Sequence, residues 1–328
     1  MLLALALCKE IHIKYVSEHV NEVKRVAEIA RGETPVSRLR GLIPGKQTIA
    51  APGVFSPIVA MLAEKSGFDV LYFSGGGYSN LQGMPDLGVT TLSEVVEAVH
   101  RITAVTNLPL IVDADTGFGE AVNVMRTVRE MRNAGAAAIH IEDQVTPKRC
   151  GHLEGKEVVD AEEMVKKLVS AKEVADRELL LIARTDARAV EGLDSAIARA
   201  RMYIRAGADI VFPEALESRE EFEEFRGKVR VPLLANMTEF GKTPYMSVSD
   251  FHEMGYNIVI FPMTLLRTML GSMKDALKEL KKNGTQKALL PRMMTREQIY
   301  RLIDYYRYEE VDSRALKVAR KLHRTRSA

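Results

Sequence analysis

The chain has 328 residues, and 46% of them are hydrophobic, so it is long enough to bury a large core. Its formal net charge of only +2 excludes a strong overall field that would draw it to nucleic acid or to a membrane surface. The two cysteines, Cys8 and Cys150, argue against a disulfide framework and favour a reducing cytoplasm. No apolar run approaches the ~20 residues of a membrane span, and residues 1–7 lack the basic start and cleavage site of a signal peptide.

A glycine pattern recurs along the chain and decides the predicted fold. In four places a helix-like stretch ends in glycine and an apolar strand follows at once. These glycines are Gly67, Gly135, Gly207 and Gly255. Glycine adopts the left-handed conformation at a helix C-terminus without a Cβ clash, so each one predicts a turn from helix to strand. Two more strands open on proline, and the apolar runs at 48–51 and 179–183 complete the set. Eight strands are therefore expected, at about 47–52, 69–74, 109–114, 138–142, 179–184, 208–213, 232–236 and 257–261.

Helices are predicted between these strands. They are expected at 122–131, at 92–102 and 194–204 with Ser93 and Asp194 as N-caps, and after the capping-box match Ser218-Arg-Glu-Glu221. The strands are continuous apolar runs, as buried parallel strands are, and alternation of strand and helix implies a parallel sheet. Eight such units favour an α/β fold that closes into a (β/α)₈ TIM-type barrel over an open doubly wound sheet.

The whole chain, 1–328, is expected to form one catalytic domain. An N-terminal helical arm covers 1–45, with its helix at about 9–31, and the barrel covers 46–270. C-terminal helices fill 271–328, at about 276–282 and 296–305. Their apolar positions need a surface to cover, which is either the chain's own barrel or a neighbouring subunit.

Polar residues stand where the predicted strands end, which in this fold is the edge that carries the active site. A single polar strand end is usually a helix cap or a loop hydrogen bond, but six of them together indicate a site. They are Ser74–Gly77, Asp113 with Asp115, Glu142 with Asp143, Arg184 with Asp186, Glu214, and Asn236 to Glu239.

Asp113 and Asp115 are two residues apart, so both are expected to face the same side of the strand end. With Glu142 they form a cluster of hard oxygen ligands, which favours Mg²⁺ over Zn²⁺. The alternative is that the two aspartates cap the following helix. The Gly-rich run 74–77 is predicted to be a loop whose N–H groups could hold a carboxylate or a phosphate, a signal that is weak by itself.

The segment Lys148-Arg149-Cys150-Gly151-His152 is the most unusual in the chain. Two cations and a histidine beside one cysteine are expected to lower the thiol pKa and make Cys150 reactive. A structural cysteine normally has apolar neighbours, which this one lacks. As a nucleophile Cys150 would need a third, orienting group, and the local sequence identifies none.

These residues resemble the isocitrate lyase / phosphoenolpyruvate mutase superfamily over about residues 35–310. The Lys-Arg-Cys-Gly-His run is specific to the lyase side of that superfamily. The matching segments are 72–77, 85–88, 112–119, 140–144, 148–152, 183–186, 212–214, 236–240 and 284–287.

The resemblance implies that Mg²⁺, with Mn²⁺ as a substitute, lies near Asp113 and Asp115 and chelates the 2-hydroxy acid half of a substrate. Asp86 and Glu142 would join the outer shell of the metal. It further implies C-terminal helices swapped between the subunits of a homotetramer. The substrate contacts that it implies are Ser74, Gly75, Gly76, Cys150, Gly151, Arg184, Glu214, Asn236, Thr238, Arg267 and Arg296.

The implied reaction is retro-aldol cleavage of 2-methylisocitrate to pyruvate and succinate, so the partner is a small tricarboxylate or dicarboxylate, without nucleic acid or membrane. Cys150 would be the acid, poised by Lys148, Arg149 and His152, and Tyr72 or a metal-bound water would be the base. The pocket around the substrate methyl would be lined by Phe212 and Pro262. The alternative substrates are isocitrate, 2,3-dimethylmalate and carboxyphosphonoenolpyruvate. A non-enzymatic scaffold is disfavoured because Asp113, Asp115 and Cys150 are all present.

Overall fold

The computed structural model describes residues 33–325, and the predicted helix at about 9–31 lies outside them. Eight parallel strands form one sheet, and each begins and ends within about two residues of its predicted position. They are β1 (Ile49–Val54), β2 (Leu71–Phe73), β3 (Leu110–Asp113), β4 (Ala138–Glu142), β5 (Leu180–Thr185), β6 (Ile210–Pro213), β7 (Leu234–Asn236) and β8 (Ile258–Phe261).

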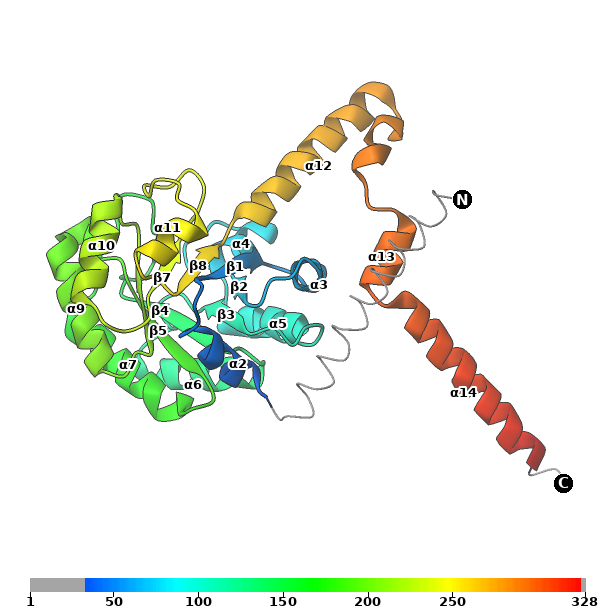
Figure 1. The fold of residues 1–328 in the computed structure, drawn as a ribbon, viewed down its shortest axis with the longest axis horizontal. Helices are drawn as coiled ribbons and strands as arrows, with labels where there is room; N and C mark the ends of the chain where they lie inside the picture. Colours follow the sequence, from blue (N-terminus) through cyan, green and yellow to red (C-terminus); the bar gives the residue numbers. More distant parts are fainter. Residues whose placement is uncertain (1–32, 326–328) are drawn as a thin grey trace.

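The sheet closes into a barrel, which confirms the predicted (β/α)₈ fold (Figure 1). The strand order is β6-β5-β4-β3-β2-β1-β8-β7, and Ile49 on β1 pairs with Ile258 on β8. A parallel bridge between Val211 and Leu233 joins the two remaining edges. Because all strands run the same way, their C-terminal ends meet at one mouth.

The helices of the described chain are α2 (Pro35–Leu42), α3 (Pro57–Lys65), α4 (Gly75–Leu81), α5 (Leu92–Thr103), α6 (Ala121–Asn133), α7 (Ala161–Ala175), α8 (Arg188–Glu191), α9 (Leu193–Arg205), α10 (Arg219–Lys228), α11 (Val248–Glu253), α12 (Thr264–Asn283), the 3₁₀ helix η1 (Lys287–Arg292), α13 (Arg296–Leu302) and α14 (Tyr305–Thr325). Those between β1 and β8 surround the barrel, α2 precedes β1, and the others follow β8 (Figure 1). None of the helices within 33–325 has the length and apolar character needed to cross a bilayer.

Two predicted N-caps are wrong. Helix α5 is capped by Thr91, which makes a reciprocal capping box with Glu94, and not by Ser93. Helix α9 is preceded by Gly192, and Asp194 lies inside its first turn, where a negative charge favours the helix dipole. The Ser218 side chain does cap α10, by accepting the Glu221 N–H at 3.3 Å.

Two apolar layers hold the barrel together. Inside it, alternate strand residues such as Ile49, Ile111 and Ile182 pack with Tyr72 and Phe212. Outside it, the other strand residues pack against the helices. Burial of each large apolar side chain stabilises the fold by roughly 1.5–3 kcal/mol, so a rigid frame holds the strand ends.

The C-terminal helices α12 to α14 form an arm: α12 and α14 extend away from the barrel, whereas on α13 the Arg301 carbonyl oxygen accepts a hydrogen bond from Lys65 of α3 at 3.0 Å (Figure 1). On α12, apolar residues recur at a spacing of three and four from Leu266 to Leu280, which places them on one face. Leu266 is the one α12 residue that is buried, whereas Leu277 is 68% exposed. The arm therefore carries an apolar face that the described part of the chain leaves uncovered.

Candidate active site

A cavity of about 240 Å³ opens at the C-terminal ends of the strands, the mouth that the sequence predicted. It collects side chains from six strand ends and from the loops that follow them. Its lining is Tyr72, Ser74, Gly76, Asn80, Asp86, Asp113, Lys148, Cys150, Gly151, His152, Leu153, Arg184, Phe212, Glu214, Asn236, Thr238, Glu239, Phe240, Gly241, Pro262, Met263 and Arg267.

Asp113, Asp115 and Asp86 form an acidic side of this cavity around Lys148. The Lys148 ammonium lies 2.8 Å from Asp115 Oδ1 and contacts Asp86 Oδ1. Burial raises the pKa of Asp115 to about 6 even though Lys148 opposes the shift. Burial would also raise the pKa of Asp113, but His140, Lys148 and Arg184 outweigh it and lower that pKa.

The Gly-rich run 74–77 is not the loop that we expected, because helix α4 begins there. The Ser74 side chain caps α4 by accepting the Gly77 N–H at 3.0 Å. The Gly75 N–H donates to Asp113 Oδ2 at 3.1 Å. A Cβ at Gly75 would lie 2.9 Å from the same oxygen, so only glycine permits this approach. Gly75 thus orients Asp113 and does not itself line the cavity.

Arg184 lies at the centre of the opposite side, among buried carboxylates. Its Nε and Nη2 donate to Asp186 at 2.9 and 3.1 Å, and its Nη1 lies 3.1 Å from Glu142 Oε2. The guanidinium carbon lies 5.3 Å from the centre of the Phe212 ring. Burial raises the pKa of Glu142 well above its ordinary value, although Arg184 acts to lower it.

His152 joins this arginine side to the loop after β7. Its Nδ1 accepts the Lys242 N–H at 3.0 Å, and its Nε2 lies 3.1 Å from Glu214 Oε1. A nitrogen that accepts a backbone N–H carries no proton, so the proton is on Nε2 and is donated to Glu214. Burial alone would raise the pKa of Glu214, but Arg184 and His152 outweigh it and lower that pKa.

The predicted low pKa of Cys150 is wrong. Burial raises the pKa of the thiol, and the N–H of His152 only partly offsets this. The cations beside it in sequence do not turn toward the sulfur, since Lys148 pairs with aspartates and the His152 ring bonds Glu214. Cys150 therefore carries a protonated thiol that lines the cavity.

Gly151 lets the Cys150 loop lie directly against the side chains of Arg184 and Glu214. A Cβ there would lie 2.6 Å from Arg184 Nη2 and would also collide with Glu214 Oε1, and neither side chain can move because both are buried. We expect Gly151→Ala to displace Cys150 and to lower kcat by ~10²-fold, the scale of a 1 Å misplacement. Gly227→Ala is the control, because no atom lies within 4 Å of its Cβ position. Equal steady-state rates in the two variants would contradict this reading.

Tyr72 is bonded to a residue that the sequence did not single out. Its hydroxyl lies 2.8 Å from His140 Nε2, and His140 Nε2 lies 3.5 Å from Asp113 Oδ1. Burial raises the pKa of Tyr72 well above its ordinary value and lowers the pKa of His140 to about 4. Both side chains are therefore neutral. The signal for His140 was its position as a polar residue inside the apolar strand β4.

Two predicted site residues lie away from the cavity. Arg149 is exposed, and its backbone is held by Gln144, which bonds both its N–H and its carbonyl oxygen at 2.9 Å. Arg296 begins α13 on the C-terminal arm and is not part of the lining. Arg267 does line the cavity, where its Nη1 lies 2.7 Å from Glu239 Oε2.

The acidic side has buried oxygens that suit a hard cation. Asp115 Oδ1 and both Glu142 oxygens accept no hydrogen bond, although the cations at 2.8 and 3.1 Å are near. Within residues 33–325, no three acidic, histidine or cysteine side chains converge on one point as a preformed metal cage. Mg²⁺ needs no such cage, since it is usually held by one or two carboxylates and keeps several waters. Asp113 and Asp115 therefore fit as its protein ligands.

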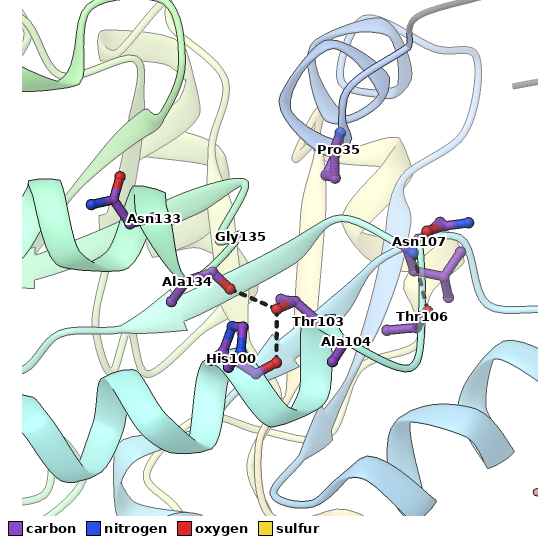
Figure 2. A pocket seen from close by; sticks show the side chains of 10 residues that line it. Pro35, His100, Thr103, Ala104, Thr106, Asn107, Asn133, Ala134 and Gly135 are labelled. Atoms are coloured by element: carbon purple, nitrogen blue, oxygen red, sulfur yellow. Dashed lines mark hydrogen bonds between the residues drawn. The ribbon is translucent and has the colours of Figure 1, made fainter. Parts of the chain in front are cut away.

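A second cavity, of about 290 Å³, lies at the opposite end of the barrel, where α5 and α6 end (Figure 2). The Thr103 hydroxyl lies 3.1 Å from the His100 carbonyl oxygen and 2.6 Å from that of Ala134. Among the residues that line it, none is a carboxylate, lysine or arginine. The acids, the arginines and the cysteine all lie at the other mouth, which is the candidate active site.

This arrangement defines the class of the protein: a (β/α)₈-barrel enzyme with a charged cavity at its C-terminal mouth. The sequence profile of phosphoenolpyruvate phosphomutase matches residues 39–281. The chain therefore belongs to this family, which is part of the PEP mutase/isocitrate lyase superfamily.

Relatives of known activity align over most of the chain. A 2-methylisocitrate lyase from Aeropyrum pernix is 54% identical over 290 residues, which cover 88% of this chain and 94% of that protein. A crystal structure of 2,3-dimethylmalate lyase superposes with a TM-score of 0.81 at 37% identity, over 86% of this chain and 95% of the other. A phosphonopyruvate hydrolase solved with oxalate and Mg²⁺ gives 0.79 at 29% identity, over 86% and 99%.

Proposed function

We propose that this protein is a carbon–carbon lyase that cleaves 2-methylisocitrate to pyruvate and succinate. The observation that carries this proposal is the protonated thiol of Cys150, which lines the same cavity as Asp113 and Arg184. A lyase of this kind needs an acid for the carbon that it releases, and Cys150 is placed to be that acid. The 54% identity to a 2-methylisocitrate lyase supports the same substrate.

The balance of charged side chains that line the cavity supports the binding of a metal cation beside the substrate. Among the described residues, three cationic side chains (Lys148, Arg184 and Arg267) and four carboxylates line it, so the lining lacks the positive excess that a polycarboxylate requires. We propose Mg²⁺ at Asp113 and Asp115, with Asp86 and Glu142 nearby and Mn²⁺ as a substitute. When bound, the metal would supply Lewis-acid polarisation of the 2-hydroxy acid oxygens.

The residues of the chain would then bind the substrate and move protons. Arg184 and Arg267 would hold carboxylates, which guanidinium groups bind in a bidentate manner. Loss of the hydroxyl proton makes a ketone at that carbon, the neighbouring C–C bond breaks, and its electron pair stays on the succinate carbon. Cys150 would donate the proton to that carbon. Tyr72 is disfavoured as the base because its raised pKa keeps its proton in place.

An assay with four substrates tests the proposal. We expect turnover of 2-methylisocitrate with Mg²⁺, loss of turnover with EDTA, and recovery with Mg²⁺ or Mn²⁺. Isocitrate, 2,3-dimethylmalate and carboxyphosphonoenolpyruvate are the competitors, and 2,3-dimethylmalate is favoured second because of the structural match at 37% identity. One methyl or methylene in a pocket discriminates by only ~1–3 kcal/mol, so we expect a preference of 10–200-fold. Faster turnover of a competitor would overturn the substrate assignment.

We propose that the enzyme is a cytoplasmic homotetramer in which the arm of one chain covers another, so that the barrel and the arm act as one catalytic unit. The exposed apolar face of α12 and the position of Arg296 outside its own cavity support this proposal. Light scattering should give four times the 36.5 kDa chain mass. Leu277→Asp should reduce the oligomer, because it places a charge on the apolar face. A monomeric parent protein would contradict the proposal.

A further inference from the structure

Lys156 is a buried cation that the proposed reaction does not use. It follows the Cys150 loop in the sequence, and its side chain is 1% exposed. The ammonium lies 2.8 Å from Asp186 Oδ1 and donates a hydrogen bond to the carbonyl oxygen of Gly151. A lysine ammonium is strongly hydrated and is almost never fully buried unless it is paired. The contacts with Asp186 and with Gly151 satisfy the buried ammonium, and they connect two parts of the site.

The first part is the end of strand β5. Asp186 accepts from Lys156 and, through both carboxylate oxygens, from Arg184. Its own backbone N–H donates to Asp143 Oδ1 at 2.8 Å, and Asp143 Oδ2 accepts from the hydroxyl of Tyr203 at 2.7 Å. Asp186 is therefore held in place by the barrel, and it accepts hydrogen bonds from both Lys156 and Arg184.

The second part is the loop that carries the thiol. Gly151 lies against Arg184 and Glu214 so closely that a Cβ would collide with both. Its carbonyl oxygen is the acceptor for Lys156, and the preceding residue is Cys150. A shift of Lys156 would therefore move the Gly151–His152 peptide, and with it the adjoining Cys150, relative to Arg184, which itself stays bonded to Asp186.

We propose that Lys156 is a positioning residue that ties the Cys150 loop to Asp186 and so fixes the thiol relative to the guanidinium of Arg184. This inference rests on the proposed function in its catalytic consequence, since Cys150 acts there as the acid. The tie itself is a property of the loop and can be measured without turnover. Replacement of Lys156 should release the loop while Arg184 keeps its bonds to Asp186.

The test measures alkylation of Cys150 by iodoacetamide, in a Cys8→Ser background so that one thiol reacts. The plateau rate at high pH is compared between variants, because it reports access to the thiol and not its ionisation. We expect Lys156→Met to raise this rate about tenfold or more and to lower kcat by ~10²-fold with little change in KM. Lys156→Arg, which keeps the charge and the donors, should restore both values to within a few-fold of the parent.

Lys172→Met is the matched control, since it removes a lysine that pairs with Asp209 at 3.0 Å, far from the cavity lining. It should leave both rates unchanged. If Lys156→Met does not fold, the same two rates on Lys156→Gln decide the question. If the plateau rate of alkylation is unchanged in the folded Lys156 variant, Lys156 does not hold the Cys150 loop, whatever kcat the variant has. A raised plateau rate in a protein whose parent cleaves none of the four substrates supports the tie and rejects the proposed function.

Discussion

Cys150→Ser should lower kcat by ~10²–10⁴-fold, the range that a positioned acid contributes. Serine nearly preserves the size of the side chain, but its hydroxyl is a far weaker acid than a thiol. The substrate would still be held by Arg184 and Arg267, and the metal by aspartates that Cys150 does not bond. We therefore expect nearly unchanged affinities for Mg²⁺ and substrate, measured by calorimetry, beside a collapsed turnover.

Cys8→Ser provides the control for this experiment, because it removes the other cysteine of the chain. It should retain the parent kcat. Near-normal turnover of Cys150→Ser would remove the thiol from the mechanism and would leave Cys150 as a residue that only fills the loop. A large rise in KM with an unchanged kcat would instead assign Cys150 to binding.

Arg184→Met should abolish turnover and lower the free energy of unfolding by about 3–5 kcal/mol, the usual cost of removing one partner from a buried ion pair. The guanidinium is the counter-charge for Glu142 and Asp186, and it also lowers the pKa of Glu214. Without it these carboxylates stay buried with too few cations. Chemical denaturation measures the change, and Arg219→Met is the control. Arg219 is exposed, so its loss should leave the free energy of unfolding nearly unchanged.

The destabilisation of Arg184→Met should depend on pH in a defined direction. In the parent protein the lowered pKa of Glu214 contributes stability that is present above its ordinary pKa and is lost as pH falls. In the variant the pKa of Glu142, which burial already raises well above its ordinary value while Arg184 acts to lower it, rises further, so the penalty for its buried charge grows as pH rises. The difference in unfolding free energy should therefore be smaller at pH 5 than at pH 8. A difference independent of pH would mean that lost packing, not charge, is the cause.

The strand positions predicted from the sequence were confirmed, because they depend on local chemistry. A glycine that ends a helix and an apolar run after it fix where each strand begins, as at Gly135 before β4. The N-caps of α5 and α9 were each misplaced by two residues, because Ser93 and Asp194 are good capping residues, as Thr91 is. Only the backbone geometry at the helix start distinguishes between them.

The candidate site was predicted as a set of residues, but their electrostatics were not. The polar strand ends at Asp113, Arg184, Glu214 and Asn236 do line one cavity. The prediction for Cys150 was wrong because it counted the charges of its sequence neighbours. In the fold Lys148 turns to aspartates, and burial then determines the pKa of the thiol.

By itself, therefore, the sequence determined the eight-stranded barrel and the acids, arginines and cysteine at its mouth. Repeated local turns and strand ends specify these features without knowledge of distant contacts. The tertiary structure alone decided how the Cys150 loop is held, because Lys156 meets Asp186 across 30 positions in the chain. It also decided which groups are neutral, since burial and paired charges set each pKa only after the strands close. Thus Cys150, whose sequence neighbours led us to expect a lowered pKa, has a raised pKa and carries a protonated thiol in the folded protein.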